Sequence, residues 1–529
     1  MHHLNPQQLA RLGTLVLALA CGTAQAQTLR WATQGDLQTL DPHARNELLT
    51  NSINGQVYET LITRDRQLRL VPGLATEWKQ IDPTTWRMTL RSGVRFHDGA
   101  AFTADDVVFS YVRAQSASSD LRVYAAAMGQ VRKVDDATVE FALPQINPVF
   151  LEHATIIPIM SKAWCEEHNA VLPQDFKKQE EKYSALNANG TGPFKVVSRQ
   201  PDIKTVFQRN EQWWGNFEGN LREVVYTPVK SDATRTAALV SGSLDLILDP
   251  APQDVQWLLT TPGIKVLQGV ENRALFIGMD QARDELLYSS VRGKNPFKDV
   301  RIRKALYHAV DIETLRTKLM RGLAMPTGSV IASPLGNFND PALEKRLPFD
   351  LAQARSLLAE AGYPNGFDVT LDCPNNRYIR DEAICVALAG MWAQIGVRVA
   401  VNAMPRIQFF AKGEKLDVSM YLLGWGGTIT DAEVTLTPVL RSRGDNGVGY
   451  FNWGNYRNAK LDELAAASSR EIDPQQREKL IRAALQEHDA QVHHIPLHRQ
   501  VIPWAMRSNI VAAHRPDNWL EWRWITIGP

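Results

Sequence analysis

Three apolar segments in the second half of the chain, at 367–372, 397–401 and 418–423, have the length and the flanking residues of strands. Between the first two, residues 379–394 carry apolar side chains at helical spacing. A strand, a helix and a strand with short connections form a βαβ unit, in which the two strands pair in parallel. The pattern therefore predicts an α/β fold that contains parallel strands.

Other segments extend this picture. Residues 29–33 and 85–90 are strand-like, the second by alternation of apolar and polar positions, and 300–320 is amphipathic at helical spacing. Thr103, followed by two acidic residues, and Asp350 are placed to cap the first turns of helices. The chain thus mixes strands and helices along its whole length.

The loops that follow two of these strands form the candidate ligand site, because ligands of open α/β sheets bind beyond the carboxyl ends of the strands. Arg377 follows 367–372, and its planar guanidinium can bind a carboxylate through two parallel hydrogen bonds. The next helix would add unpaired backbone N–H groups. Trp425 follows 418–423 among glycines that allow close approach to a ligand. The alternatives are a surface arginine and a core tryptophan.

Two acidic residues, Asp431 and Glu433, come shortly after Trp425. If both loops face one cleft, Arg377 would bind the carboxylate of a zwitterionic ligand and Trp425 would pack against its middle. Asp431 or, failing that, Glu433 would bind its ammonium, because a desolvated charge needs a partner. The alternative is that both acids are solvated on the surface.

The N-terminus is typical of a secretory signal. Arg11 precedes an apolar run at 12–20 and the small-residue pattern Ala-Gln-Ala at 24–26. The run is too short to span a bilayer, which takes about 20 residues. A buried helix and a lipid anchor at Cys21 are the alternatives, but Leu stands one place away from the usual lipoprotein pattern. We therefore expect residues 1–26 to be a signal peptide that is cleaved after Ala26, and the mature protein to be periplasmic.

Charge and hydropathy exclude several classes of protein. The chain has 529 residues, with 58 basic and 57 acidic side chains, and it becomes neutral once Arg11 is removed with the leader. A balanced chain without a long basic run does not predict nucleic-acid binding. At 44% hydrophobic residues and this length, a multidomain globular protein is expected.

Three cysteines remain after the leader: Cys165, Cys373 and Cys385. Their low, odd number excludes a disulfide-stapled small fold, and no CxxC pair indicates zinc. An oxidising compartment would permit one bridge, and Cys373 with Cys385 is the pair closest in sequence. We expect these two to lie close enough to bridge and so to stiffen the loop that carries Arg377.

No set of residues indicates catalysis or a cofactor. His493, His494 and His498 lie on a strand-like segment, where the second and third share one face and the first takes the other, so a metal site is not expected. No GxSxG, HExxH, Walker or GxGxxG motif in strand–helix context is present. An enzyme is therefore not expected, nor is a bound cofactor or metal.

Several motifs together resemble the signature of the family 5 extracellular solute-binding proteins, which serve dipeptide, oligopeptide and nickel ABC importers. The longest match runs from LVPGLA at 70–75 through LRSGVRFHDG at 90–99 to FTADDV at 102–107. GTGPF at 190–194, DVRIRKAL at 299–306 and IPL at 495–497 extend the similarity over the whole mature chain.

The resemblance implies a periplasmic-binding-protein type II-like, three-domain clamshell with mixed, largely parallel sheets. It also implies a monomer that closes on its ligand between domains I and III and delivers it to an ABC permease in the inner membrane. The implied division is a discontinuous domain I of 27–70, 190–275 and 497–529, domain II of 71–189, and domain III of 276–496.

The resemblance also implies roles for the two loops. In peptide-binding members an Asp shortly after the Gly-Trp motif holds the ligand's α-amino group, and an Arg in the first loop holds its carboxylate. Arg377, between Asn376 and Tyr378, matches the second role. Thr428 stands where the Asp is expected, and Asp431 comes three residues later. Either the amino anchor has moved or the ligand lacks a free amine there.

The predicted ligand is a di- or oligopeptide or a peptide-like conjugate. The alternative within the same fold is an oligosaccharide or opine, since the 14 tryptophans would suit stacking on sugar faces. A secreted hydrolase and a metal or haem carrier are further alternatives with less support in the residues.

Overall fold

The structure is a computed structural model in which the description covers 27–176, 178, 181–332, 340–426, 429–444 and 447–529. The predicted signal peptide, with Cys21, and Thr428 lie outside these residues. In the part of the chain that is described, no helix is long and apolar enough to cross a membrane.

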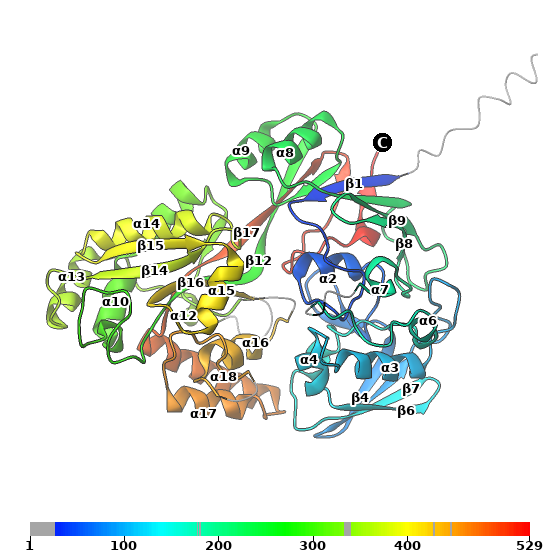
Figure 1. The fold of residues 1–529 in the computed structure, drawn as a ribbon, viewed down its shortest axis with the longest axis horizontal. Helices are drawn as coiled ribbons and strands as arrows, with labels where there is room; N and C mark the ends of the chain where they lie inside the picture. Colours follow the sequence, from blue (N-terminus) through cyan, green and yellow to red (C-terminus); the bar gives the residue numbers. More distant parts are fainter. Residues whose placement is uncertain (1–26, 177, 179–180, 333–339, 427–428, 445–446) are drawn as a thin grey trace, which may run out of the picture.

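An eleven-stranded sheet runs through both halves of the molecule (Figure 1). Its order is β15 (Arg398–Met404), β14 (Asp368–Pro374), β16 (Met420–Gly426), β12 (Ile264–Met279), β17 (His494–Arg507), β11 (Leu246–Leu248), β1 (Thr28–Thr33), β10 (Glu223–Pro228), β9 (Lys204–Arg209) and β8 (Phe194–Gln200), with β13 (Ala324–Pro326) paired to β17. The long strands β12 and β17 connect the two halves.

The sheet is mixed, as expected. Parallel pairing is confined to β1 with β10 and β11, and to β14 with β15 and β16. The other pairs among these eleven strands are antiparallel, including β12 with β17 in the middle of the sheet. Parallel pairing is thus less extensive than the resemblance implied.

The predicted βαβ unit is present as β14, α14 (Asp381–Ala393) and β15, with β14 and β15 parallel in register from Asp368↔Arg398 to Pro374↔Met404. β16 pairs with β14 in parallel at Leu371↔Met420. The carboxyl ends of β14 and β16 therefore lie at the same edge of the sheet, and the two loops that follow them emerge on the same side.

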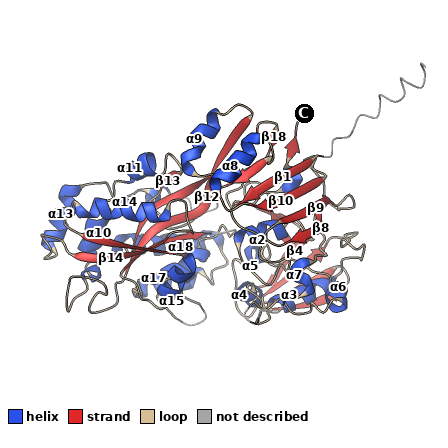
Figure 2. Ribbon diagram, turned by 45° about the horizontal axis from the view of Figure 1, so that its top comes forward, coloured by secondary structure: helices blue, strands red, loops and turns tan. Residues whose placement is uncertain are grey.

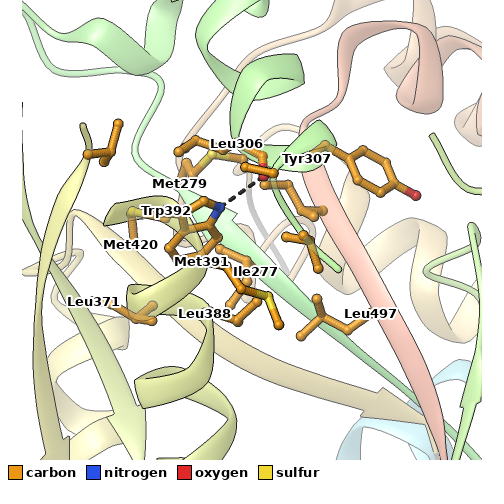
Figure 3. Packing of buried hydrophobic residues seen from close by; sticks show 14 of the residues in the cluster. Ile277, Met279, Leu306, Tyr307, Leu371, Leu388, Met391, Trp392, Met420 and Leu497 are labelled. Carbon is orange, nitrogen blue, oxygen red and sulfur yellow. Dashed lines mark hydrogen bonds between the residues drawn. The ribbon is translucent and has the colours of Figure 1, made fainter. Parts of the chain in front are cut away.

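Helices cover both faces of this half of the sheet (Figure 2). Trp392 of α14 lies at the centre of one core, where its Nε1 donates to the Leu306 carbonyl at 2.9 Å, and Ile277 and Met420 lie among its neighbours (Figure 3). Phe276 and Tyr421, which alternate with these residues along β12 and β16, belong to a second core on the opposite face. The burial of both faces explains the continuous apolar runs of these strands.

The other half has two large cores and a smaller one around Leu239 and Ile247. Trp31, Trp504 and Trp522 centre the first, beside β1 and β17. The second lies between α3 (Ala104–Ala114) and a four-stranded antiparallel sheet in the order β4 (Ala75–Asp82), β5 (Thr85–Leu90), β7 (Thr138–Ala142) and β6 (Gln130–Asp135). A capping box between Thr103 and Asp106 begins α3, as its sequence predicted.

The prediction of one helix over 300–320 was wrong. The chain forms α10 (Val300–His308), then α11 (Ile312–Thr314) and a π-helical turn, η2 (Leu315–Leu319). Asp311 caps the second segment by accepting a hydrogen bond from the Thr314 backbone N–H at 3.0 Å. A side chain that bonds to the local backbone offers an alternative to continued helix, which periodicity alone does not reveal.

The remaining elements are short or lie on the periphery. The helices among them are α2 (Leu48–Asn54), α4 (Arg122–Ala127), α5 (Phe150–His153), α6 (Lys162–Glu167), α7 (Tyr183–Leu186), α8 (Asp232–Ser241), α9 (Pro252–Thr260), η1 (Pro296–Lys298), α12 (Pro341–Glu344), α13 (Leu351–Glu360), α15 (Arg406–Glu414), α16 (Glu433–Thr435), η3 (Leu436–Leu440), α17 (Ala459–Ser468), α18 (Pro474–Gln491) and η4 (Trp522–Trp524). The strands among them are β2 (Ile62–Arg64), β3 (Leu70–Pro72), β18 (Ile510–Val511) and β19 (Thr526–Ile527).

Candidate ligand-binding site

A cavity of about 690 Å³ opens between widely separated parts of the chain. Its lining residues come from 42–73, 91, 124–158, 193–216, 273, 377, 425–434 and 515–523. The volume is within the range of about 300–1,000 Å³ that is usual for small-molecule sites. Both predicted loops contribute, through Arg377 and Trp425, so the structure brings together the two residues that the strand-end argument singled out.

Arg377 lines the cavity without an ion-pair partner. Its guanidinium carbon lies 5.3 Å from the centre of the Tyr378 ring, and its side chain makes no hydrogen bond or ion pair within the described residues. The neighbouring Arg273 guanidinium, together with desolvation, lowers the pKa of Arg377. A lowered arginine pKa here means that the surroundings disfavour the cation, which an anionic ligand would correct.

Arg273, on β12, is the second cation of this wall. Its Nε donates to Glu271 Oε1 at 3.2 Å, and its guanidinium carbon lies 6.0 Å from the Tyr378 ring centre. The other oxygen of Glu271 accepts from Gln500 Nε2 at 2.6 Å. Glu271 therefore pairs with Arg273 and with no second arginine of this wall, and both of its oxygens are already bonded.

Tyr378 ties the two loops together. Its buried hydroxyl donates to the Gly424 carbonyl at 3.1 Å and accepts from the Gly424 backbone N–H at 2.8 Å. This pair of bonds fixes the end of β16 against the loop after β14. Tyr378 does not line the cavity, so its place in the structure is to position the residues that do.

Trp425 satisfies both interpretations of its sequence position. Its ring centre lies 4.4 Å from that of Phe451, and its Nε1 donates to the Val434 carbonyl at 2.6 Å. The half-buried ring packs against a core and also lines the cavity. It therefore offers a fixed apolar surface.

The N-terminus of α14 does not offer its backbone donors to a ligand. Asp381 Oδ2 accepts from the backbone N–H groups of Arg377 at 2.8 Å and Tyr378 at 3.0 Å, and its Oδ1 accepts from Glu382 N–H at 3.0 Å. Asp381 thus occupies two N–H groups of the preceding loop and one of the first helical turn, and the expectation that this helix end binds a carboxylate stays a prediction that these bonds do not support.

Asp431 is engaged by another side chain. Its two oxygens accept from Arg477 of α18 at 2.6 and 2.7 Å, and neither residue lines the cavity. The expected role of Asp431 as ammonium ligand stays a prediction that this geometry does not support, since the carboxylate already has a bidentate partner.

Glu433 and Asn376 also lie away from the cavity lining. Glu433 accepts a hydrogen bond from the Thr437 hydroxyl, and desolvation raises its pKa to about 7. Asn376 is exposed, and its Oδ1 accepts from the Arg406 backbone N–H at 2.8 Å. The ligand-binding roles expected for both residues remain untested predictions.

The opposite side of the cavity carries a carboxylate enclosed by indoles. Glu59 accepts from Trp213 Nε1 at 3.1 Å, Trp214 Nε1 at 2.8 Å and the Thr191 hydroxyl at 2.8 Å. Desolvation raises the pKa of Glu59 to about 7. The Arg91 guanidinium lies 3.9 Å from the centre of the Trp214 ring, so a cation stands beside this group.

Beside it, the C-terminal segment forms a closed ion network. Arg515 donates to both oxygens of Asp517 and, at 2.8 Å, to Glu521, which also accepts from Arg523 at 3.4 Å. The side chain of Arg515 is 3% exposed. Each charge in this network has an opposite partner.

The predicted disulfide is confirmed: Cys373 of β14 is bonded to Cys385 of α14, with the Cα atoms 6.6 Å apart. The bond joins the strand before the Arg377 loop to the helix after it. Cys165 is a buried free thiol.

The histidines do not converge. His493 stacks on Tyr456 at 3.8 Å between ring centres, and His494 bonds to His488 at 2.9 Å. Within the described ranges, no group of three or more His, Cys, Asp or Glu side chains could hold a metal ion.

Sequence reasoning missed most of the cavity. Arg273 lies next to a buried apolar run, and Arg91, Arg515 and Arg523 lie far from the βαβ unit. The adjacent Trp213 and Trp214 were the one local signal available, because paired aromatics outside an apolar segment often line a pocket.

Comparison with known proteins places the chain in a family. The model for "Bacterial extracellular solute-binding proteins, family 5 Middle" matches residues 69–447. The glutathione-binding protein GsiB of Salmonella typhimurium is 27% identical over 485 residues, covering 90% of each protein.

Solved structures show the same fold. CtaP of Listeria monocytogenes, an ABC transporter substrate-binding protein, has a TM-score of 0.81 at 21% identity and covers 95% of this chain and 99% of its own. DppA of Helicobacter pylori, in complex with the peptide STSA, has a TM-score of 0.76 at 22% identity over 95% and 98% of the two chains. The chain therefore belongs to the family 5 bacterial extracellular solute-binding proteins, the substrate-binding components of ABC importers.

Proposed function

We propose that this protein captures a short peptide or peptide-like compound in the 690 Å³ cavity and delivers it to the membrane permease of an ABC importer. The observation that carries the proposal is the guanidinium of Arg377, which lines the cavity without a carboxylate partner and has a lowered pKa. A desolvated guanidinium gains most from a carboxylate, through two charge-assisted hydrogen bonds. A peptide-like ligand is also supported by the name of GsiB, a glutathione-binding protein, and by the peptide STSA that is bound to DppA.

The walls of the cavity suit such a ligand. Trp425 presents a fixed apolar surface beside Arg377, and Trp213 and Trp214 present aromatic rings from the other side. An uncharged oligosaccharide could stack on these rings, but it would leave Arg377 desolvated without a partner, which is costly. A peptide carboxylate satisfies the charge and leaves its side chains against the aromatic walls.

We also propose where in the cell the protein works. Residues 1–26 would direct export and be removed, and the mature protein would work in the periplasm as a monomer, binding its ligand between two domains that close on it. The proposed division of the chain is 27–70, 190–275 and 497–529 for domain I, 71–189 for domain II, and 276–496 for domain III.

The test uses the mature protein purified from the periplasm without unfolding. Native mass spectrometry before and after denaturation should release a compound that carries a carboxylate and an amide bond. Added back to stripped protein at 100 times its dissociation constant, it should stabilise the fold by about 2.7 kcal/mol. Release of a neutral sugar, or thermal stabilisation by sugars and by no peptide-like compound, would contradict the proposal.

A further inference from the structure

Every acidic side chain that lines the cavity, within the described residues, is already satisfied by the protein. These are Glu59, Asp517 and Glu521. Glu59 holds two indole N–H donors and a hydroxyl, and the other two bind Arg515 and Arg523. None of the three stands as an open carboxylate facing the ligand.

Three of the acids just behind the lining are paired with arginines. Glu152 pairs with Arg64 and Glu271 with Arg273, while Asp431 binds Arg477 on both oxygens.

The cations of the cavity outnumber the acids available to them. The arginines that line it are Arg64, Arg91, Arg273, Arg377, Arg515 and Arg523. Arg64, Arg273, Arg515 and Arg523 each contact a carboxylate, and Arg91 lies beside Glu59 across the Trp214 ring. Arg377 and Arg91 make no ion pair in the described residues, and Arg91 Nε donates to the Gly73 carbonyl at 3.0 Å, so the cavity carries a net positive charge that is centred on Arg377 and Arg273.

An ammonium group entering this cavity would meet two obstacles. It would lose its water without finding an open carboxylate, and a buried cation without a partner is costly. It would also be repelled by Arg377 and Arg273, since like charges repel each other at short range. A carboxylate meets neither obstacle.

We propose that the ligand is an N-blocked carboxylate: an amino acid or short peptide whose amino group is acylated or closed into a lactam. The inference rests on the proposed function and narrows its ligand class. Arg377, with the terminal nitrogens of Arg273 beside it, binds the carboxylate, and the blocked amine lies against uncharged lining. The site thereby rejects the free peptides that differ only in an ammonium group.

Calorimetric titration of ligand-stripped mature protein with matched pairs tests this. The pairs are Ala-Ala and N-acetyl-Ala-Ala, and glutathione and N-acetyl-glutathione. At pH 7 the acetylated member that fits should bind at least tenfold more tightly than its parent, and C-terminal amidation should abolish its binding. Between pH 7 and 9 the free-amine parent should gain affinity as its amine, of pKa about 8, loses its proton, and the acetylated member should not.

Arg377→Gln provides the matched variant. This substitution should weaken binding of the acetylated ligand. It should also reduce the ratio of the two affinities within a pair to less than threefold, because the ammonium of the parent is repelled less. Arg95→Gln, at an exposed arginine bonded to the Gly99 carbonyl, is the control and should preserve the tenfold ratio.

The outcomes separate the two proposals. Tighter binding of a free-amine parent would overturn this inference and leave the peptide-like function standing. If no member of either pair binds while a neutral sugar does, both this inference and the proposed function are wrong. A tenfold preference for the acetylated member that survives in Arg377→Gln would also overturn the inference, since the preference would then have another cause.

Discussion

The cavity has two walls that differ in how they use arginine. On one, here called the C-terminal wall, Arg515 binds Asp517 and Glu521, and Arg523 contacts the same glutamate. On the other, the loop wall, Arg273 shares Glu271 with Gln500, and Arg377 has no carboxylate at all. The same residue type is thus neutralised within the fold on one wall and left for a ligand on the other.

Because of this difference, arginine substitutions on the two walls should affect different properties, the stability of the fold on one and ligand affinity on the other. Removing a cation from a closed network leaves buried acids unpaired, so the fold should suffer. Removing an unpaired cation relieves repulsion in the free protein, so the fold should not suffer and binding should. The comparison therefore predicts opposite consequences for one kind of substitution at two sites.

The largest expected effect is on the C-terminal wall. Arg515→Gln leaves the buried Asp517 without its cation and leaves Glu521 with Arg523 as its remaining partner. This loss should cost about 3–5 kcal/mol of unfolding free energy. Urea titration of the unliganded protein measures it. A loss below about 1 kcal/mol would show that this network behaves like a surface ion pair and that the two walls do not differ.

The next effect is on the loop wall. Arg377→Gln should cost about 2–5 kcal/mol of ligand binding, the range for losing one partner of a desolvated charge pair. Its unfolding free energy should stay within about 0.5 kcal/mol of wild type, as for sites without a structural role. Calorimetry with the purified ligand measures the loss of binding free energy, and urea titration measures the unfolding free energy. A variant that loses stability but keeps its affinity would show that Arg377 serves the fold and not the ligand.

Removing the disulfide should have a smaller effect than either arginine substitution. Cys373→Ala with Cys385→Ala opens a ring of sequence separation 12, which should cost about 2–3 kcal/mol of unfolding free energy on the chain-entropy account. Ligand affinity should fall by less than in Arg377→Gln, because the charge remains and only its loop is loosened. Equal loss of affinity in the two variants would mean that rigidity, rather than charge, controls binding.

The smallest effect concerns Glu433, an acid near the loop wall that lies outside the cavity. Burial raises its pKa from 4.5 to about 7, so its contribution to stability is present below pH 4.5 and is lost as the pH rises through 7. Glu433→Gln should therefore stabilise the protein by about 1–3 kcal/mol at pH 8 and change little at pH 4.5. Thermal unfolding at the two pH values measures the difference, and destabilisation at pH 8 would indicate that ionised Glu433 has a partner.

Local patterns predicted much of the fold. The βαβ unit, β16, the cap of α13 by Asp350 and the strand at 85–90 all depend on periodicity or on a residue and its near neighbours. The helix expected over 300–320 failed for a local reason that periodicity does not register, the cap at Asp311.

The site was predicted only where it follows strand ends. Arg377 and Trp425 were found because β14 and β16 are parallel neighbours. Arg273 was not, since its position depends on β12 pairing with β16 about 150 residues later in the chain. The ion pair of Asp431 was missed for the same reason, because its partner Arg477 comes from α18. Long-range pairing decides which charges are free, and a single sequence does not display it.

A crystal structure of the protein with the ligand that co-purifies from the periplasm would show which group Arg377 binds. We predict a ligand carboxylate within hydrogen-bonding distance of the Arg377 guanidinium, with Asp431 still bound to Arg477 and the Arg515 network unchanged. A ligand that places an ammonium group against Asp431, or that leaves Arg377 without an anionic partner, would contradict it.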